Sequence, residues 1–282
     1  MNNLLRANFA RLWKSRIFWL GILYSIGMGV IASTTQYREM ILIPGHHPHI
    51  DNILFSIGLF MPVVSAVFTG LFLGTEYSDG TIRNKLIVGK TRAAVYLSNL
   101  TVCAAAVILI HLANLAAILV IGFPLVGNVE STFSRLMALT LISLATLIAL
   151  TAIWLFLGML IHNKPIYCVT ILLLSIFLLM NAMIIENDLA EKEYRDAYSF
   201  SYTDASGETL EEYVEQAPNP RYLSGFKREV YEFLYDFMPG CQLLQIAHQE
   251  TAHPGRLPLY SLLIFAVSTG CGLFFFRIKN IK

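Results

Sequence analysis

The sequence predicts an all-α membrane protein with six transmembrane helices, and three observations support this prediction. Of the 282 residues, 56% are hydrophobic and 14% are charged, whereas soluble domains carry about 25% charged residues. The mean hydropathy is +0.60. The 20 basic and 19 acidic residues leave six charge-free runs, each longer than the roughly 18 apolar residues that mark a spanning helix. This composition excludes a soluble enzyme, a nucleic-acid-binding protein and a disordered scaffold.

Residues 1–16 precede the first run and are predicted to form a cytoplasmic amphipathic elbow helix. Leu5, Phe9, Leu12 and Trp13 recur at helical spacing, and basic residues fill much of the rest. A basic flank that only fixes the topology is an open alternative.

The six runs themselves define the predicted transmembrane helices, which are 17–37, 52–75, 93–129, 136–163, 165–185 and 257–276. The first five fall within a membrane domain at 17–185, and the sixth is followed by a cytoplasmic tail at 277–282. Gly70 and Gly74 form a small-xxx-small pair that permits close helix contact. The third run exceeds one straight span, and Gly122 and Pro124 predict that its helix ends near residue 122.

The first run has an alternative interpretation as a cleaved signal peptide. Val30, Ile31 and Ala32 offer small residues at a cleavage-like spacing after a basic segment. The apolar stretch is slightly too long for a signal peptide, however, and cleavage would leave only five spans. We therefore favour a spanning helix.

The basic residues predict the orientation of the six helices. One side carries both termini and 12 Lys and Arg residues, in 1–16, 76–92, Lys164 and 277–282. The short loops on the other side, 38–51 and 130–135, carry two. Because positively charged short loops stay in the cytoplasm, we expect both termini to be cytoplasmic, in the plasma membrane of a bacterium.

The basic loop at residues 76–92 is predicted to contain a short helix. Ser78 or Asp79 can cap its start, Gly89 suits the left-handed position that ends a helix, and Thr91 can cap the next span. Such a helix under the membrane is typical of a docking element, while a solvated loop that binds nothing is equally open. Gly89-Lys90-Thr91 is not part of a phosphate loop, because that motif needs a glycine where Asn84 stands.

The loop at residues 186–256 carries 14 acidic and 6 basic residues, a net charge of −8 (6 − 14). Thr209 to Glu212 fits a capping box, and a helix is predicted before Pro239 from the spacing of Phe226, Val230, Phe233, Leu234 and Phe237. Leu243, Leu244 and Ile246 suggest a second amphipathic stretch. We expect a small helical extracytoplasmic subdomain that lies on the outer leaflet or caps the helices.

Metal binding is not predicted. His46, His47 and His49 lie close in sequence, but Gly45 and Pro48 between and beside them give no ligand spacing on a fixed scaffold. A solvated loop is the favoured interpretation.

The charge-free runs lack the ionisable groups that ion-coupled carriers usually place in their spans. Energy is therefore expected to arrive from outside the membrane. Among the neutral polar residues, His111 and Asn114 lie one helical turn apart and, with Asn181, are the candidates for lining a pathway.

These features together resemble a known family. An elbow helix, six spans, and a loop with Glu76, Gly80-Thr81-Ile82, Leu86, Gly89 and Arg92 are similar to the permease subunit of a type-2 ABC exporter. Pro239-Gly240-Cys241-Gln242 before the last span resembles the variety with a large external loop between spans five and six.

The resemblance implies that residues 76–92 hold a coupling helix seated on a separate ATPase chain. Ile82 and Leu86 would be its apolar contacts and Arg83 and Lys85 its polar contacts. Glu76 and Asp79 would hold the loop geometry. The implied coupling residues are Glu76, Asp79, Gly80, Thr81, Ile82, Arg83, Lys85 and Leu86.

The resemblance also implies the partners. Two permease chains, identical or related, would pack on two copies of an ABC ATPase subunit, which would bind ATP and Mg²⁺. This chain is then neither an enzyme nor a cofactor carrier. The uncharged spans and the acidic loop favour a hydrophobic or cationic substrate such as a drug, an antimicrobial peptide or a lipid. Two alternatives remain, a membrane sensor or assembly protein acting through the external loop and an ion-coupled carrier.

Overall fold

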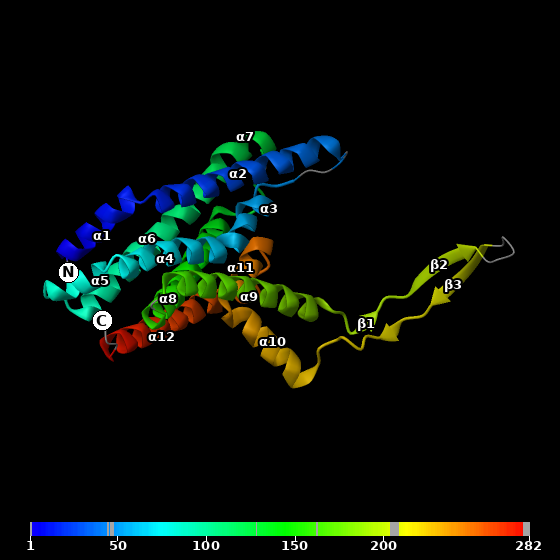
Figure 1. Ribbon diagram of the computed structural model, residues 1–282. Coiled ribbons are helices and arrows are strands. Elements are labelled where there is room, and N and C mark those ends of the chain that lie inside the picture. The colour runs from blue at the N-terminus through cyan, green and yellow to red at the C-terminus, as the bar shows by residue number, and fades with distance from the viewer. Residues whose placement is uncertain are drawn as a thin grey trace.

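The computed structural model describes residues 2–43, 45, 48–127, 129–161, 163–203 and 209–278. Within these residues, six helical segments are long and apolar enough to cross a membrane. They run side by side along one axis (Figure 1). The segments are α2 (Arg16–Leu42), η1 with α4 (Ser56–Phe60, Met61–Ser78), α6 with η2 and α7 (Arg92–Ala117, Ile118–Gly122, Phe123–Val126), α8 (Phe133–Leu160), α9 (Lys164–Ala190) and α12 (Arg256–Ile278). The prediction of a six-span membrane protein is confirmed.

The two ends of this bundle differ, and we name them here. The basic end holds α1 (Asn2–Lys14), the short helix α5 (Thr81–Ile87) and the last turn of α12. Both chain termini lie at this end (Figure 1). The hairpin end holds α3 (Asp51–Leu54), α10 (Gly225–Phe237), α11 (Pro239–His248) and four strands.

The helices extend beyond the charge-free runs. α4 continues to Ser78 and so includes Glu76, and α9 continues to Ala190 and includes Glu186. The prediction that the third helix ends near Gly122 is wrong. The chain passes through a π-helical turn, and Pro124 lies in the first turn of α7, where a proline is tolerated. The helix ends instead at Gly127, which adopts a φ of +80°.

Packing in the bundle relies on close helix contacts. α4 is the most buried span, whereas α2, α9 and α12 are the least buried. The predicted close contact at Gly70 is confirmed, because a Cβ there would lie 3.2 Å from Cys168 Sγ on α9. At Gly272 of α12, a Cβ would overlap the Tyr96 hydroxyl of α6. Small residues therefore set the helix spacing on both sides of the bundle.

The N-terminal segment forms a separate helix, α1, and Ser15 divides it from α2, while its role as a cytoplasmic elbow stays a prediction. The Ser15 hydroxyl accepts a hydrogen bond from the Phe18 backbone N–H and so caps α2. The buried face of α1 is Leu4, Asn8 and Leu12. The position of α1 in a membrane interface stays a prediction.

The loop at residues 186–256 is only partly helical, so the prediction of a helical subdomain needs correction. Thr209 to Glu212 do not start a helix. They lie in strand β3 (Thr209–Val214), which pairs antiparallel with β2 (Tyr198–Thr203), and β1 (Tyr194–Arg195) pairs with β4 (Ala217–Pro218). From Tyr198 to Thr203, aromatic and hydroxyl residues alternate with the period of two that defines a strand.

The second half of the loop returns to helices, as predicted. α10 ends before Pro239, but this proline also begins α11, whose residues Pro239 to Ala247 are all buried. Gln242 anchors α11 in the bundle. Its side-chain oxygen accepts hydrogen bonds from the hydroxyls of Thr146 on α8 (2.8 Å) and Ser261 on α12 (2.7 Å). α11 therefore caps the bundle rather than lying on its surface.

Candidate functional site at the basic end of the bundle

The helix predicted between residues 76 and 92 is present as α5, but it begins differently from the prediction. Asp79 is the C-cap of α4, and the Ser78 hydroxyl turns back to Thr75 O and Asp79 Oδ1. α5 starts from Gly80, which takes the left-handed conformation with φ +66°. That conformation favours glycine, so the prediction that Ser78 or Asp79 caps α5 is wrong. The left-handed Gly89 and the Thr91 cap of α6 are confirmed.

The two faces of α5 are also assigned differently by the structure. Ile82 is 1% exposed, and both Ile82 and Leu86 pack against the core of their own chain. They are therefore supports of α5 rather than outward contacts. The outward face includes Arg83 together with Ile87 and Val88, which are 72% and 76% exposed. These two apolar side chains are not covered by the rest of their own chain and are accessible to another chain or to lipid.

Glu76 is the centre of a buried polar cluster below α5. Its side chain is fully buried, and its Oε1 accepts hydrogen bonds from Arg11 of α1 and Lys85 of α5. Its Oε2 accepts one from Asn99 Nδ2 of α6 at 2.5 Å. A buried carboxylate is tolerated only when it is paired and hydrogen-bonded. The pairing therefore connects four helices, α1, α4, α5 and α6.

Asn8 completes this cluster from α1. Its amide nitrogen donates to Ser98 Oγ and to Asn99 Oδ1, both at 2.8 Å, and its amide oxygen accepts from Lys85 Nζ at 2.9 Å. We call Asn8, Arg11, Glu76, Lys85, Ser98 and Asn99 the Glu76 cluster. Each amide in it both donates and accepts, so the cluster fixes α1 and α5 relative to the first turns of α6.

The electrostatics of the Glu76 cluster depend on its centre. Burial lowers the pKa of the Lys85 ammonium below its ordinary value, and the charge of Glu76 and its hydrogen bond oppose this shift. The Arg11 guanidinium also stacks on the Phe72 ring, 3.9 Å from the centroid. Arg11 and Lys85 therefore share one carboxylate, and both depend on Glu76 to balance their positive charge.

Sequence reasoning identified Glu76 and Lys85 but missed their partners Asn8, Arg11, Ser98 and Asn99. The available signal was Asn8, which stands with Leu4 and Leu12 at i, i+4 and i+8 on α1. A polar residue in the middle of such a stripe indicates a buried hydrogen-bond partner.

The three predicted pathway residues do not come together. His111 Nε2 lies 3.0 Å from Ser143 Oγ on α8, whereas Asn114 on the same helix donates to the Ser25 carbonyl of α2 at 2.9 Å. Asn181 donates to Phe177 O within its own helix. His111 and Asn114 are fully buried between helices of one chain. Their part in a pathway stays a prediction.

Metal ligands do not gather at either end of the described part of the chain, where no group of three His, Cys, Asp or Glu residues is placed to hold an ion. Of the histidine cluster considered above, His46 and His47 lie outside the described residues. His49 Nε2 lies 3.7 Å from Glu130.

Comparison with protein-family models matches residues 4–185 to the ABC-2 family transporter protein model. No curated protein gives a match. The matched segment holds the whole Glu76 cluster, the first four spans and most of the fifth, which is more than half of the chain. Permeases of this family associate with an ABC ATPase. The chain therefore belongs to the ABC-2 transporter family, and it is a multi-pass permease subunit of an ABC transporter.

Proposed function

We propose that this chain is the membrane subunit of an ATP-driven exporter and that α5 is the coupling helix on which a separate ATPase subunit acts. One observation carries the proposal. α5 exposes Arg83, Ile87 and Val88 on its outer side, while on its inner side Lys85 is ion-paired with the buried Glu76. A partner that contacts the outer face of α5 is thus connected to Glu76, the centre of the cluster, through Lys85 of the same helix.

The cluster supplies a physical route for coupling. A displacement of α5 either carries the end of α4 with it or separates Lys85 from Glu76. Breaking a buried ion pair by removing one partner costs about 3–5 kcal/mol, so moving the helices together is favoured. Arg11 and Asn99 extend the same constraint to α1 and α6. A push on α5 is therefore distributed over three further helices.

The remaining parts of the proposal follow from the distribution of basic residues and from what membership of the family implies. The basic end faces the cytoplasm, where the ATPase resides, because short basic loops stay inside. ATP and Mg²⁺ bind to two copies of the ATPase, and this chain alone hydrolyses no ATP. A second permease chain, identical or related, completes the pathway. The weakly buried α2 and α9, with exposed Leu23, Leu173 and Phe177, support such a contact with another chain or with lipid.

The proposal is tested with the double variant Ile87→Asp, Val88→Asp, co-expressed with its ABC ATPase subunit. We expect the ATPase to be lost from the purified complex, because two charges would be buried at the contact. Leu42→Asp is the matched control, since Leu42 is a similarly exposed apolar residue (64%) at the hairpin end. Co-purification and transport at the wild-type level in the double variant would exclude α5 as the contact.

A further inference from the structure

The hairpin formed by β2 and β3 carries a row of aromatic side chains on one face. Tyr198, Phe200 and Tyr202 alternate along β2, so their side chains point to the same side. Successive ring centroids lie 6.1 and 6.0 Å apart, with the rings tilted by 33° and 31°. We call these three residues the aromatic row.

This aromatic row is exposed to solvent. The three side chains are 58%, 42% and 46% exposed in chain order. Residues on the other face of β2 are hydroxyl side chains, Ser199, Ser201 and Thr203, all exposed. An isolated two-stranded hairpin is marginal in water, and large exposed aromatic surfaces mark binding sites. The row is thus an unpartnered apolar face on a polar strand.

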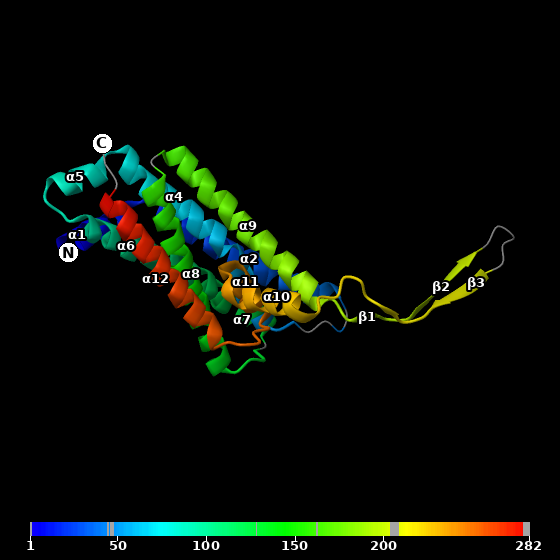
Figure 2. The same cartoon turned by 90° about the horizontal axis from the view of Figure 1, so that it is seen from below.

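The hairpin also projects from the bundle. In Figures 1 and 2 its strands β2 and β3 lie beyond the ends of the helices, away from the bundle. Strand β2, which carries the aromatic row, therefore lies apart from the packed helices.

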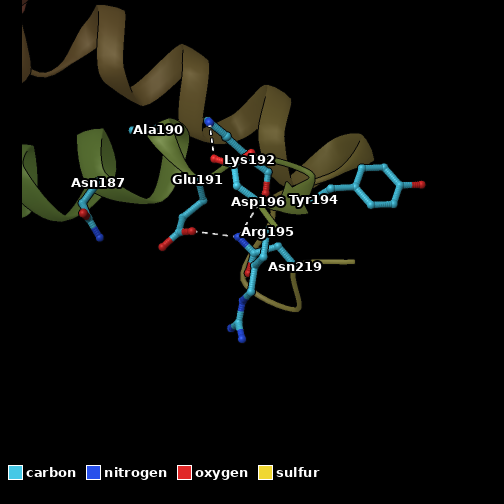
Figure 3. A pocket seen from close by; sticks show the side chains of 8 residues that line it. All are labelled: Asn187, Ala190, Glu191, Lys192, Tyr194, Arg195, Asp196 and Asn219. Carbon is cyan, nitrogen blue, oxygen red and sulfur yellow. Dashed lines mark hydrogen bonds and ion pairs between the residues drawn. The ribbon is translucent and has the colours of Figure 1, made fainter. Parts of the chain in front are cut away.

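The base of the hairpin is held by Asn219 (Figure 3). Its backbone N–H donates to Glu193 O at 2.9 Å, and its side-chain nitrogen donates to Glu191 Oε2 at 2.7 Å. In the same place Lys192 is paired with Asp196 at 2.6 Å. The two strands β1 and β4 and this clamp fix where the hairpin leaves the bundle.

The charge of the hairpin identifies the class of partner. Residues 197–215 include five acidic residues and no Lys or Arg. The nearby Lys192 already has a carboxylate partner. A second copy of this hairpin and an anionic membrane would both be repelled by this charge. A partner with positive charge and apolar groups is attracted, since aromatic faces also bind cations.

We propose that the aromatic row of the β2–β3 hairpin, on a segment of net negative charge, forms a docking surface for a cationic amphipathic peptide. The carboxylates attract its basic side chains, and Tyr198, Phe200 and Tyr202 cover its apolar ones. This binding does not depend on the proposed export function or on the ATPase, so either can fail without the other.

The test measures binding to the full chain in nanodiscs of zwitterionic phosphatidylcholine, without ATPase. The probe is a fluorescent peptide of alternating Lys and Leu, and a peptide of alternating Glu and Leu is the charge control. We expect the Lys peptide alone to bind. Phe200→Ser with Tyr202→Ser should weaken its affinity by about tenfold or more, as expected for aromatic anchors.

Tyr213→Ser is the matched control, because Tyr213 is more exposed (67%) but pairs with Ser199 and so lies on the opposite face. Its effect should stay below about twofold. A loss as large as that of the Phe200 and Tyr202 variant would overturn the proposal. Equal binding of the Glu peptide, or equal binding to empty nanodiscs, would also overturn it.

Amide hydrogen exchange of β2 and β3 shows whether the aromatic variant keeps the hairpin. If protection is lost, the decision passes to Glu211→Gln with Glu215→Gln, which leaves the aromatic row intact. Glu211 pairs with Ser201 and so lies on the opposite face, which means that this variant tests attraction through the charge of the hairpin rather than contact. We expect this variant to bind about threefold more weakly and with less dependence on salt. Unchanged affinity and salt dependence would contradict the docking surface.

Discussion

The basic end and the hairpin end of the bundle place their charged and aromatic residues in opposite ways. At the basic end, Glu76 is buried and four helices meet around it. In the hairpin, aromatic side chains such as Phe200 are exposed and carboxylates face water. Buried ion pairs connect helices rigidly because separating the two charges is costly. An exposed apolar surface, in contrast, is available to bind a partner. Under the two proposals above, the basic end transmits the action of the ATPase and the hairpin end binds a peptide.

The largest expected effect comes from removing the centre of the Glu76 cluster. Glu76→Ala leaves Arg11 and Lys85 without their carboxylate. It also removes the charge and hydrogen bond that raise the pKa of Lys85 against the lowering effect of burial. We expect a loss of about 3 kcal/mol, the low end for a broken buried pair because Arg11 is partly solvated. Thermal denaturation in detergent measures it. Asp79→Asn, an exposed site nearby, is the control and should change little.

A stability loss in Glu76→Ala no larger than that in Asp79→Asn would mean that the cluster does not hold the basic end together. The basic end would then not differ from the hairpin in being held together by buried charge.

The next effect tests whether the hairpin end also has a rigid part. Gln242→Leu removes the acceptor of the Thr146 and Ser261 hydroxyls between α8, α11 and α12. We expect a loss of about 2 kcal/mol, as for buried polar groups left unsatisfied, again by thermal denaturation. Glu229→Gln on the exposed side of α10 is the control. Equal midpoints for the two variants would show that α11 is not anchored by Gln242.

The smallest stability effect is expected from the hairpin itself. Replacing residues 196–215 by a short Gly-Ser linker should change stability by less than about 0.5 kcal/mol, the range of surface changes away from packed features. The hairpin lies beyond the helices in both views. A loss above about 2 kcal/mol would show that it packs against the bundle, which would remove the contrast between the two ends.

The positions of the spans could be predicted from the sequence because a lipid environment excludes charge over a whole helix length. The same rule placed the end of span two one turn too early. That rule ends a predicted span at the first charged residue, which here is Glu76. Glu76 can be buried because it is paired with Arg11, which is 65 residues away in sequence but close in space. Long-range pairing of this kind leaves no local pattern.

Helical periodicity alone also could not assign the two faces of α5. Ile82 and Leu86 were correctly placed on one apolar side, but that side packs on the chain's own core. An apolar face looks the same whether it meets its own chain or another. The hairpin, in contrast, was predictable, because Tyr198, Phe200 and Tyr202 alternate with hydroxyl residues. The capping-box pattern at Thr209 predicts a helix instead, although Thr209 lies in the strand that pairs with this alternating segment.

The central claim, that the ATPase meets the basic end through the outer face of α5, is tested most directly by photocrosslinking in intact membranes. A benzophenone amino acid is placed at Val88 or, as the comparison, at Tyr213 of the hairpin, two exposed positions at opposite ends. We expect position 88 to capture the ABC ATPase subunit and position 213 not to do so. Capture from position 213, or none from position 88 and its exposed neighbours Arg83 and Ile87, would contradict the account.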